Sequence, residues 1–487
     1  MSNSTVELRG GLYRDSVALM QISRTVAELP GVVSALIAMA TPLNLELLPR
    51  LGFAALPEAR PDDLLVAVQA DDEASLAVAL ARLDELFAAR ALTTEAVDRP
   101  PRTTRSALVR SGAPLVMVSV PGRSALVESM DALQAGADVM LFSDNVPVGE
   151  EVLLKEEAHR LGLLVMGPDC GTAIVGGVGL CFANVMAPGR VGIVAASGTG
   201  AQQVCALLDA AGIGVSAVLG TGGRDLSRAV GARSSLDAMA MLDAHAGTDL
   251  VVMLSKPPPS DVAELVEAAA AALSTPAVVG FLGAGRDDLT ALTGKVLAAL
   301  GEPPLEPPAW LSPPPGNLRS GAVRGLFSGG TLCDEAMVVA SDLLGPIRSN
   351  IPLDPSWALG SDLTAAGHLM IDFGDDQLTQ GRPHPMIDWT LRLERFAAEV
   401  ADPDCGVLLV DVVLGFGSHP APAEVLAPAV KLATESGVAV VVSLVGTSGD
   451  PQGLQATALA LQAAGASVYL SNAAAARAAA ALVKGSA

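Results

Sequence analysis

The chain has 487 residues, and its 52 acidic against 30 basic residues give a formal net charge of −22. This length is enough for about three domains, and a field this negative repels nucleic acid and anionic lipid, which excludes both as partners. Hydrophobic residues make up 51% of the chain and aromatic residues only 3%, a composition typical of tightly packed α/β layers.

The first part of the chain, residues 1–96, is predicted to form a small α+β domain with a ferredoxin-like fold. Strands are expected over 6–13, 32–39 and 64–70, and helices over 16–29 and 73–89. The N-terminus lacks the apolar core of a signal peptide, and no apolar run in the chain approaches the roughly 18 residues that span a membrane. We therefore expect a cytoplasmic protein.

A stretch rich in Pro, Arg and Thr, from Val97 to Ser111, predicts a linker. The next domain, residues 106–188, alternates strand and helix in a Rossmann-like pattern, with strands at 115–120, 139–142 and 164–166.

Two larger α/β domains are predicted over 189–301 and 321–487, separated by a stiff proline-rich linker over 302–320. The strands of the first are expected at 191–196, 215–220, 250–254 and 277–281. Those of the second are expected near 325–327, 369–373, 407–413, 439–444 and 467–470. This alternation predicts doubly wound parallel sheets, whose ligands bind at the carboxyl ends of the strands.

Both large domains begin with a strand, a turn of Ser, Gly and Thr, and a helix. The turns are Ser197-Gly198-Thr199 and Ser328-Gly329-Gly330-Thr331. Free N–H groups and the dipole of a helix start favour an anion, and glycine lets that anion approach the backbone. We interpret the turns as phosphate sites on facing helix ends; the alternative is that Ser and Thr only cap the helices.

The segment Gly381–Asp388 contains several side chains that can bind an anion or take part in catalysis. Arg382 can hold a carboxylate or phosphate through two hydrogen bonds, and His384, fixed between two prolines, can polarise a carbonyl or move a proton. The alternative is a rigid polar turn satisfied by Asp388. His419, in another turn after a strand, is a further catalytic candidate.

Three more strand ends supply binding candidates. Gly222 and Gly223 follow one strand, with Arg224 either near an anion or in a surface ion pair, and Lys256 follows the next strand. Asp372 and Asp375 lie at the end of a strand of the last domain and are also binding candidates.

No metal site is predicted. Asp372, Asp375 and Asp376 could bind a divalent cation, but their spacing equally suits helix capping. The five cysteines lie far apart without a CxxC pair, which predicts neither disulfides nor a zinc site. We expect Cys170 to pack in the core rather than act as a nucleophile.

From residue 115 onward the chain resembles a fused succinyl-CoA synthetase, with the α subunit first. Pro188-Gly-Arg-Val-Gly-Ile-Val-Ala-Ala-Ser-Gly-Thr199 resembles the α-subunit motif PGRVGIVSRSGT, and Leu369–Asp375 is similar to the β-subunit motif FLDVGGG. This resemblance implies a truncated CoA-binding-like domain over 106–188 and flavodoxin-like ligase domains of the α type over 189–301 and the β type over 321–487.

A closer resemblance, covering essentially the whole chain, is to the FdrA family. It is carried by Leu326–Ala336, Ile371–Asp376 and Gly381–Asp388. This resemblance implies a subunit of an oxamate carbamoyltransferase, which interconverts oxalurate and phosphate with oxamate and carbamoyl phosphate in allantoin breakdown. It also implies partner subunits and a carbamate kinase.

Three features of CoA ligases are missing. The strand at 278–281 runs into Leu282–Asp288 without the histidine that those enzymes phosphorylate, and the chain has neither an ATP-grasp domain nor a GxTGxxG turn. We therefore expect no cofactor, and CoA in particular is not expected.

The expected activity is that of a carbamoyltransferase subunit in a hetero-oligomer. Phosphate or carbamoyl phosphate and a small ureido acid or amide would be its substrates. The alternatives are an ADP-forming acyl-CoA synthetase subunit that uses a separate ATP-grasp partner, or a non-catalytic scaffold subunit.

Overall fold

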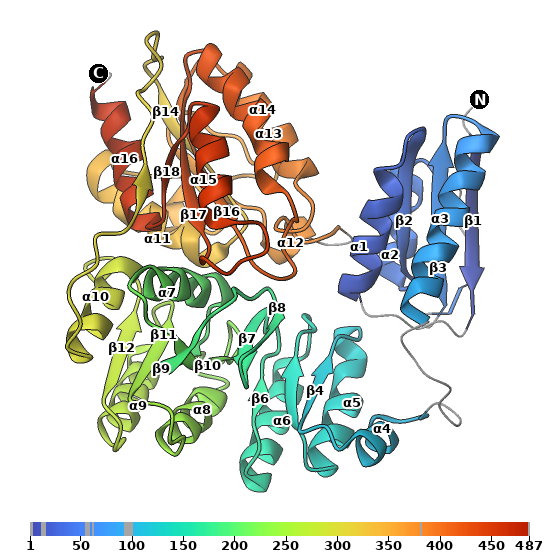
Figure 1. Ribbon diagram of the computed structural model, residues 1–487, viewed down its shortest axis with the longest axis vertical. Helices are drawn as coiled ribbons and strands as arrows, with labels where there is room; N and C mark the ends of the chain where they lie inside the picture. The colour runs from blue at the N-terminus through green and yellow to red at the C-terminus, as the bar shows by residue number, and fades with distance from the viewer. Residues whose placement is uncertain are drawn as a thin grey trace. The chain divides into compact units, whose positions relative to one another are not determined.

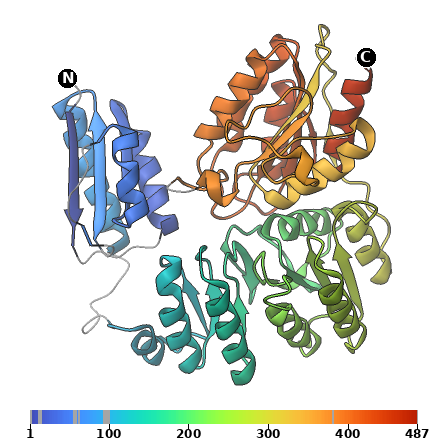
Figure 2. The same ribbon diagram turned by 180° about the vertical axis from the view of Figure 1, so that it is seen from behind.

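The computed structural model describes residues 3–10, 16–53, 59–60, 63–91, 101–379 and 382–485. The chain divides into two compact units (Figures 1 and 2). One comprises Met1–Arg110 with Asp376–Pro383, and the other comprises Ser111–Asp375 with His384–Ala487.

The first unit contains an antiparallel sheet with the strand order β1-β3-β2. Its elements are β1 (Asn3–Arg9), α1 (Ser16–Ala27), β2 (Val32–Met39), α2 (Pro42–Leu47), β3 (Leu64–Ala70) and α3 (Glu73–Ala91). Successive side chains of a strand point to opposite faces. Val66 packs in one core cluster with residues of α1 and α3, whereas Leu65 packs in another with Leu48 and Phe53. Cover on both faces explains why β3 is apolar except at the partly buried Gln69, and the predicted small α+β domain is confirmed.

The second unit begins with a parallel sheet of order β4-β5-β6. Its elements are β4 (Leu115–Val118), α5 (Gly122–Gln134), β5 (Asp138–Leu141), α6 (Val148–Leu161) and β6 (Val165–Met166). The predicted linker before it is wrong over its last residues, where the chain forms α4 (Thr104–Ser111). Thr103 and Ser106 exchange side-chain-to-backbone hydrogen bonds, a capping box that begins this helix. Residues 97–100 lie outside the described residues.

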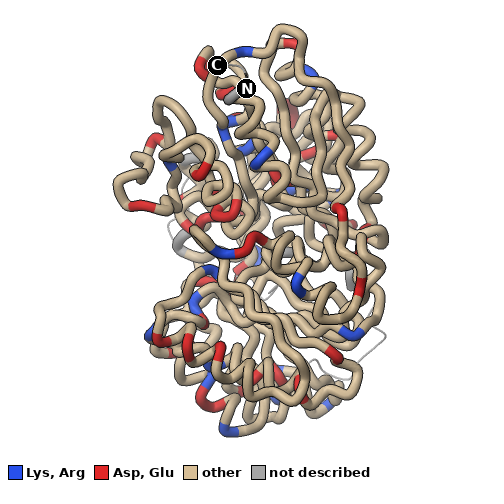
Figure 3. The backbone as a smooth tube through the Cα atoms, turned by 90° about the vertical axis from the view of Figure 1, so that its left-hand side faces the viewer, with Lys and Arg blue, Asp and Glu red and all other residues tan. Residues whose placement is uncertain are grey.

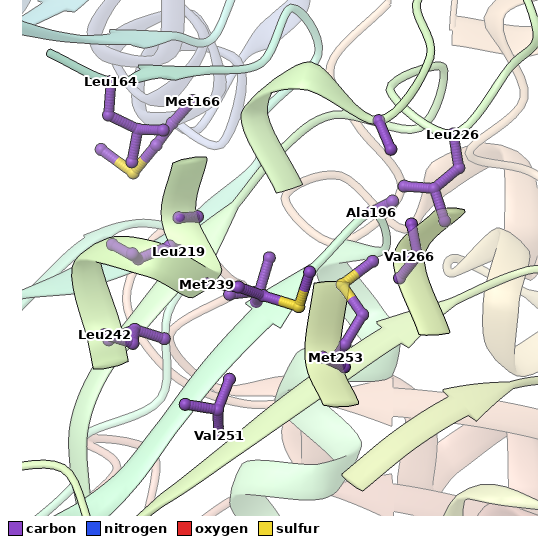
Figure 4. Packing of buried hydrophobic residues seen from close by; sticks show 14 of the residues in the cluster. Leu164, Met166, Ala196, Leu219, Leu226, Met239, Leu242, Val251, Met253 and Val266 are labelled. Carbon is purple, nitrogen blue, oxygen red and sulfur yellow. The ribbon is translucent and has the colours of Figure 1, made fainter. Parts of the chain in front are cut away.

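The next sheet has the order β12-β11-β9-β10-β7-β8. Its parallel strands are β9 (Pro188–Ala195), β10 (Val215–Gly220), β11 (Leu250–Ser255) and β12 (Ala277–Phe281), and its helices are α7 (Gly198–Ala210), α8 (Arg233–Asp243), α9 (Ser260–Ala271) and α10 (Leu289–Ala299). Figure 4 shows its apolar core, where Met239, Met253 and Val266 are buried between sheet and helices.

An antiparallel hairpin extends this sheet beyond the predicted strands. It consists of β7 (Thr172–Val175) and β8 (Val178–Cys181), joined by Gly176 and Gly177. Both glycines have positive φ, +58° and +77°, as tight hairpin turns require. The hairpin pairs with β10, so this segment joins the second sheet although the predicted domain boundary lies at 188.

The last sheet has the order β13-β18-β17-β16-β14-β15. Its elements are β13 (Ala309–Trp310), β14 (Ala322–Phe327), α11 (Gly330–Leu344), β15 (Leu369–Asp372), α13 (Thr390–Ala401), β16 (Cys405–Val413), α14 (Pro422–Glu435), β17 (Ala439–Val445), α15 (Leu454–Ala463), β18 (Ser467–Tyr469) and α16 (Asn472–Gly485). β13, from the proline-rich segment, pairs antiparallel with β18. Part of the predicted linker therefore belongs to this sheet.

Both large sheets are doubly wound, as predicted. Counted along the chain, the parallel strands follow the order 2-1-3-4 in one sheet and 2-1-3-4-5 in the other, which is the flavodoxin-like order. Ligands of such sheets bind where the strand order reverses. That point lies between β9 and β11 in the first sheet and between β14 and β16 in the second, where the two Ser-Gly turns occur.

Acidic residues outnumber basic ones along the chain (Figure 3). Among the helices of the described ranges, none has the length and hydropathy needed to cross a membrane.

Candidate functional site

The two predicted turns meet in the second unit. Ser197 caps α7, where its Oγ accepts the Gly200 N–H, and Ser197 Oγ also lies 2.6 Å from Thr331 Oγ1. Thr199 lies against Gly329, because a Cβ added at Gly329 would come within 2.6 Å of Thr199 Cγ2. The starts of α7 and α11 are therefore in direct contact, and this contact requires glycine at position 329.

The start of α7 retains free hydrogen-bond donors. In the described part of the chain, the N–H groups of Gly198 and Thr199 have no hydrogen-bond partner. Thr172 lies beside Gly198, with its Oγ1 3.0 Å from the position of an added Cβ, and donates its hydroxyl to Phe182 O. These two N–H groups are the donors that this helix start offers to an anion.

The start of α11 already holds a carboxylate. Asp411 of β16 accepts the N–H groups of Ser328 at 2.8 Å and Gly329 at 3.0 Å, as well as the Ser328 hydroxyl. Arg392 donates to the same carboxylate at 2.7 Å. Burial raises the pKa of Asp411, against the effect of Arg392 and the Ser328 bonds. Of the α11 turn, only Gly330 and Thr331 keep N–H groups that no carboxylate has taken.

Asp411 and Arg392 were not among the site residues predicted from the sequence. The available signal was a lone Asp within the otherwise apolar strand Cys405–Val413. A buried charge in such a strand needs a partner, and Arg392 on α13 supplies it.

Asp372 and Lys256 lie beside Gly330. A Cβ added at Gly330 would be 2.7 Å from Asp372 Oδ2 and 3.6 Å from Lys256 Nζ. The other carboxyl oxygen of Asp372 accepts the Gly374 N–H at 2.9 Å, and Lys256 pairs with Asp334 at 2.5 Å.

Burial raises the pKa of Asp372 to about 7, and the charges of Asp411 and Asp375 act in the same direction. For Lys256, burial lowers the pKa, but the negative charges of Asp334 and Asp372 outweigh it and the pKa is raised. At neutral pH Lys256 is therefore a cation, and the carboxyl group of Asp372 is partly protonated.

His384 belongs to the same site. Its Nε2 and Asp372 Oδ1 lie 3.2 Å and 3.1 Å from one point, the position of a Cβ added at Gly374. Burial, with the charge of Arg392, lowers the pKa of His384 to about 4, so the ring is neutral at pH 7. Its Nδ1 accepts the Met386 N–H, which places the ring proton on Nε2. His384 thus presents an N–H donor next to Asp372.

The other residues of the predicted loop are placed differently. Gly381 lies outside the described residues, and Arg382 is exposed in the segment Asp376–Pro383 of the first unit. Asp375 ends the preceding stretch of the second unit, where its charge contributes to the raised pKa of Asp372. The loop is therefore divided between the two units.

His419 is buried and connects two loops. The backbone N–H of His419 donates to Met386 O, and the ring Nδ1 accepts the Ala421 N–H at 3.0 Å. Gln452 also donates to its carbonyl. These bonds hold the turn after β16 against the residues that follow His384.

The Gly222-Gly223 turn is held by buried charges. Gly222 has φ +86°, and a Cβ there would lie 2.2 Å from Pro168 O, so only glycine fits. Asp225, three residues later, pairs with the buried Lys155 at 2.8 Å. Arg224 forms an ion pair with Glu151 at 2.9 Å, as in the second of the two predicted alternatives.

Neither thiolate nor metal chemistry is evident among the described residues. Cys170 packs in the core, and burial raises its pKa to about 12. No group of three or more His, Cys, Asp or Glu in the described ranges could hold a metal ion.

Two family models match the chain. Residues 1–101 match "AllF, heavy metal-associated domain", and residues 326–482 match "CoA-ligase". The sequence of residues 1–101 contains neither cysteine nor histidine, the side chains that bind soft and borderline metals.

The chain is also similar to individual proteins. The chain is 39% identical over 438 residues to the uncharacterized protein YahF of Escherichia coli, covering 86% of this chain and 85% of YahF. It is 32% identical over 125 residues to succinate–CoA ligase (ADP-forming) subunit alpha 1 of Archaeoglobus fulgidus, covering 25% of this chain and 43% of that protein.

A solved structure, the dinucleotide-forming acetyl-coenzyme A synthetase 1 of Ca. Korarchaeum cryptofilum, covers 76% of this chain and 82% of its own, with 16% identity and a TM-score of 0.29. The identity to YahF extends over most of both chains, and the last sheet matches CoA ligases. The chain therefore belongs to the succinyl-CoA synthetase-like family that includes YahF.

Proposed function

We propose that this chain is a subunit of a carbamoyltransferase of the oxamate carbamoyltransferase type. The reaction interconverts a ureido acid and phosphate with an amide and carbamoyl phosphate. The observation that carries the proposal is the contact between the starts of α7 and α11, combined with a loop after β12, Leu282–Asp288, that contains no histidine. Without a histidine to carry it elsewhere, a phosphate bound at this contact reacts where it binds.

His384 does not replace the missing histidine. Phosphorylation requires a ring nitrogen with a free electron pair, but Nε2 carries the proton and Nδ1 accepts the Met386 N–H. A neutral imidazole N–H instead suits the oxygen of a carbonyl that gains negative charge in the transition state.

The residues of the site have complementary roles in this reaction. The N–H groups of Gly198 and Thr199 would hold the phosphate, and Lys256 would add positive charge. The Nε2–H of His384 would polarise the ureido carbonyl. Catalysis would then come from positioning and preorganised charge.

The proposed setting is allantoin-type nitrogen catabolism, in a complex with other subunits. The match of residues 1–101 to the AllF domain supports this setting. The CoA-ligase match of residues 326–482 supports a second candidate, an ADP-forming acyl-CoA synthetase subunit that works with a separate ATP-grasp partner.

The test uses the full chain purified with its partner subunits. One reaction contains oxalurate and phosphate without ATP, and the other contains acyl-CoA, ADP and phosphate. We expect carbamoyl phosphate in the first and no ATP in the second. CoA-dependent ATP formation in place of carbamoyl phosphate would favour the second candidate.

A variant tests the assigned phosphate site. Thr199→Glu places a negative charge at the start of α7 and should abolish phosphate-dependent activity. Ser260→Glu is the matched control, because Ser260 is exposed at the start of α9, another helix that packs on the same sheet as α7. Full activity of Thr199→Glu would support a scaffold role for the two turns.

A further inference from the structure

Asp372 places a carboxyl group beside the proposed phosphate site, where a negative charge is unfavourable. Its Oδ2 faces Gly330, the residue after Gly329, and Gly329 contacts Thr199 at the start of α7. An ionised carboxylate here would repel the phosphate. As a carboxylic acid, Asp372 avoids this repulsion and is a hydrogen-bond and proton donor.

On the basis of the proposed carbamoyl transfer, we infer that Asp372 is the general acid that protonates the leaving amide nitrogen. The geometry gives each carboxyl oxygen a separate role. Oδ1 accepts the Gly374 N–H and is fixed by it, whereas Oδ2 faces the contact between α7 and α11.

The proposed step balances in atoms and charge. An oxygen of hydrogen phosphate attacks the ureido carbonyl carbon and forms the new C–O bond. The C–N bond to the amide breaks, and its electron pair takes the proton from Asp372 Oδ2. The carboxylate then recovers a proton from the hydroxyl that hydrogen phosphate brought. Ureido acid and hydrogen phosphate thus give primary amide and carbamoyl phosphate, and Asp372 is restored.

The surroundings of Asp372 favour its acid form once phosphate is bound. Burial holds its pKa near 7, the Gly374 bond and Lys256 oppose this shift, and a phosphate dianion would raise the pKa further. The charged and titratable groups that act on it or lie near it are Lys256, Asp334, Cys333, Asp375, His384, Arg392 and Asp411.

The test compares Asp372→Asn and Asp372→Glu in the intact complex. Asparagine can still accept the Gly374 N–H but has no acidic proton. We expect kcat for oxalurate phosphorolysis to fall by about 100-fold or more, with the KM for phosphate unchanged. The loss of wild-type kcat at high pH should disappear in Asp372→Asn and persist in Asp372→Glu. Asp354→Asn is the matched control, because Asp354 is exposed in the connection between α11 and β15.

The outcomes separate this inference from the proposed function. If the wild type forms carbamoyl phosphate and Asp372→Asn stays within about tenfold of it, the inference is overturned and the function stands. If Asp372→Asn loses phosphate binding, measured as the shift in Tm that inorganic phosphate produces, Asp372 is a binding residue and the inference is also overturned. If the wild-type complex forms no carbamoyl phosphate, both fail.

Discussion

Two neighbouring glutamines of α7 differ in whether their side-chain amides are hydrogen-bonded. Gln203 donates to Leu470 O and accepts the Asn472 N–H, so both ends of its amide are bonded. Gln202 is 1% exposed, yet in the described part of the chain neither atom of its amide has a partner. A buried amide without hydrogen bonds destabilises the folded state.

The same substitution should therefore have opposite effects at the two positions. Methionine has a similar shape and helix propensity but no amide. Gln202→Met should raise the free energy of unfolding by about 1–3 kcal/mol, and Gln203→Met should lower it by about 1–3 kcal/mol. Urea unfolding followed by circular dichroism measures both. A loss at position 202 equal to that at 203 would show that the amide of Gln202 is hydrogen-bonded in solution.

Much of the site was predictable at the residue scale because parallel strands end at one edge of a sheet. Thr331 follows β14 and Asp372 ends β15, which are neighbours in one sheet. Ser197 follows β9 of the other sheet and meets Thr331 where α7 and α11 are in contact. The role of Asp411 was not predictable, since it depends on which N–H groups of another strand end face its side chain. The neutral state of His384 likewise depends on burial that no local motif reports.

At the scale of elements, Glu335 of α11 joins the starts of two other helices. It accepts the Leu289 N–H of α10 at 2.6 Å and Asn472 Nδ2 of α16 at 2.7 Å. Burial raises its pKa from 4.5 to about 7. The folded chain therefore binds this proton more tightly than the unfolded chain does. The resulting stabilisation is complete below about pH 4.5 and is lost as the pH rises through about 7.

Removing this carboxyl group should change how stability depends on pH. Relative to Glu335→Gln, the wild type should lose free energy of unfolding between pH 5 and pH 8. Urea unfolding of both proteins across this range gives the difference, with Glu435→Gln, at an exposed position of α14, as the control. A constant difference across the range would contradict the prediction.

The elements themselves were predicted well where the pattern is long. β2, β3, β10 and β12 begin and end at the predicted residues. The β7–β8 hairpin was missed because its strands have four residues each around a Gly pair, and β13 because its two residues lie between prolines. Such short strands are defined by pairing with distant segments rather than by their own sequence.

At the scale of the whole molecule, the two flavodoxin-like parts of the second unit form one packed body. α7 and α10 of the first part pack against α11 and α16 of the second. Buried hydrogen bonds cross this contact, among them those of Gln203 and Glu335. The proline-rich segment was expected to separate the two parts, yet the contact beside it holds them together.

The covalent connection should therefore be dispensable for association. A protease site inserted between Pro304 and Leu305 interrupts the chain before β13, at an exposed position. After cleavage, we expect the two pieces to elute together in gel filtration at micromolar concentration. Gln203→Ala removes the bonds to Leu470 O and from the Asn472 N–H, which join the two pieces, and should weaken association by about 10- to 100-fold. If the pieces of the cleaved chain without any substitution elute separately, the linker rather than the helix contact keeps the start of α7 against α11.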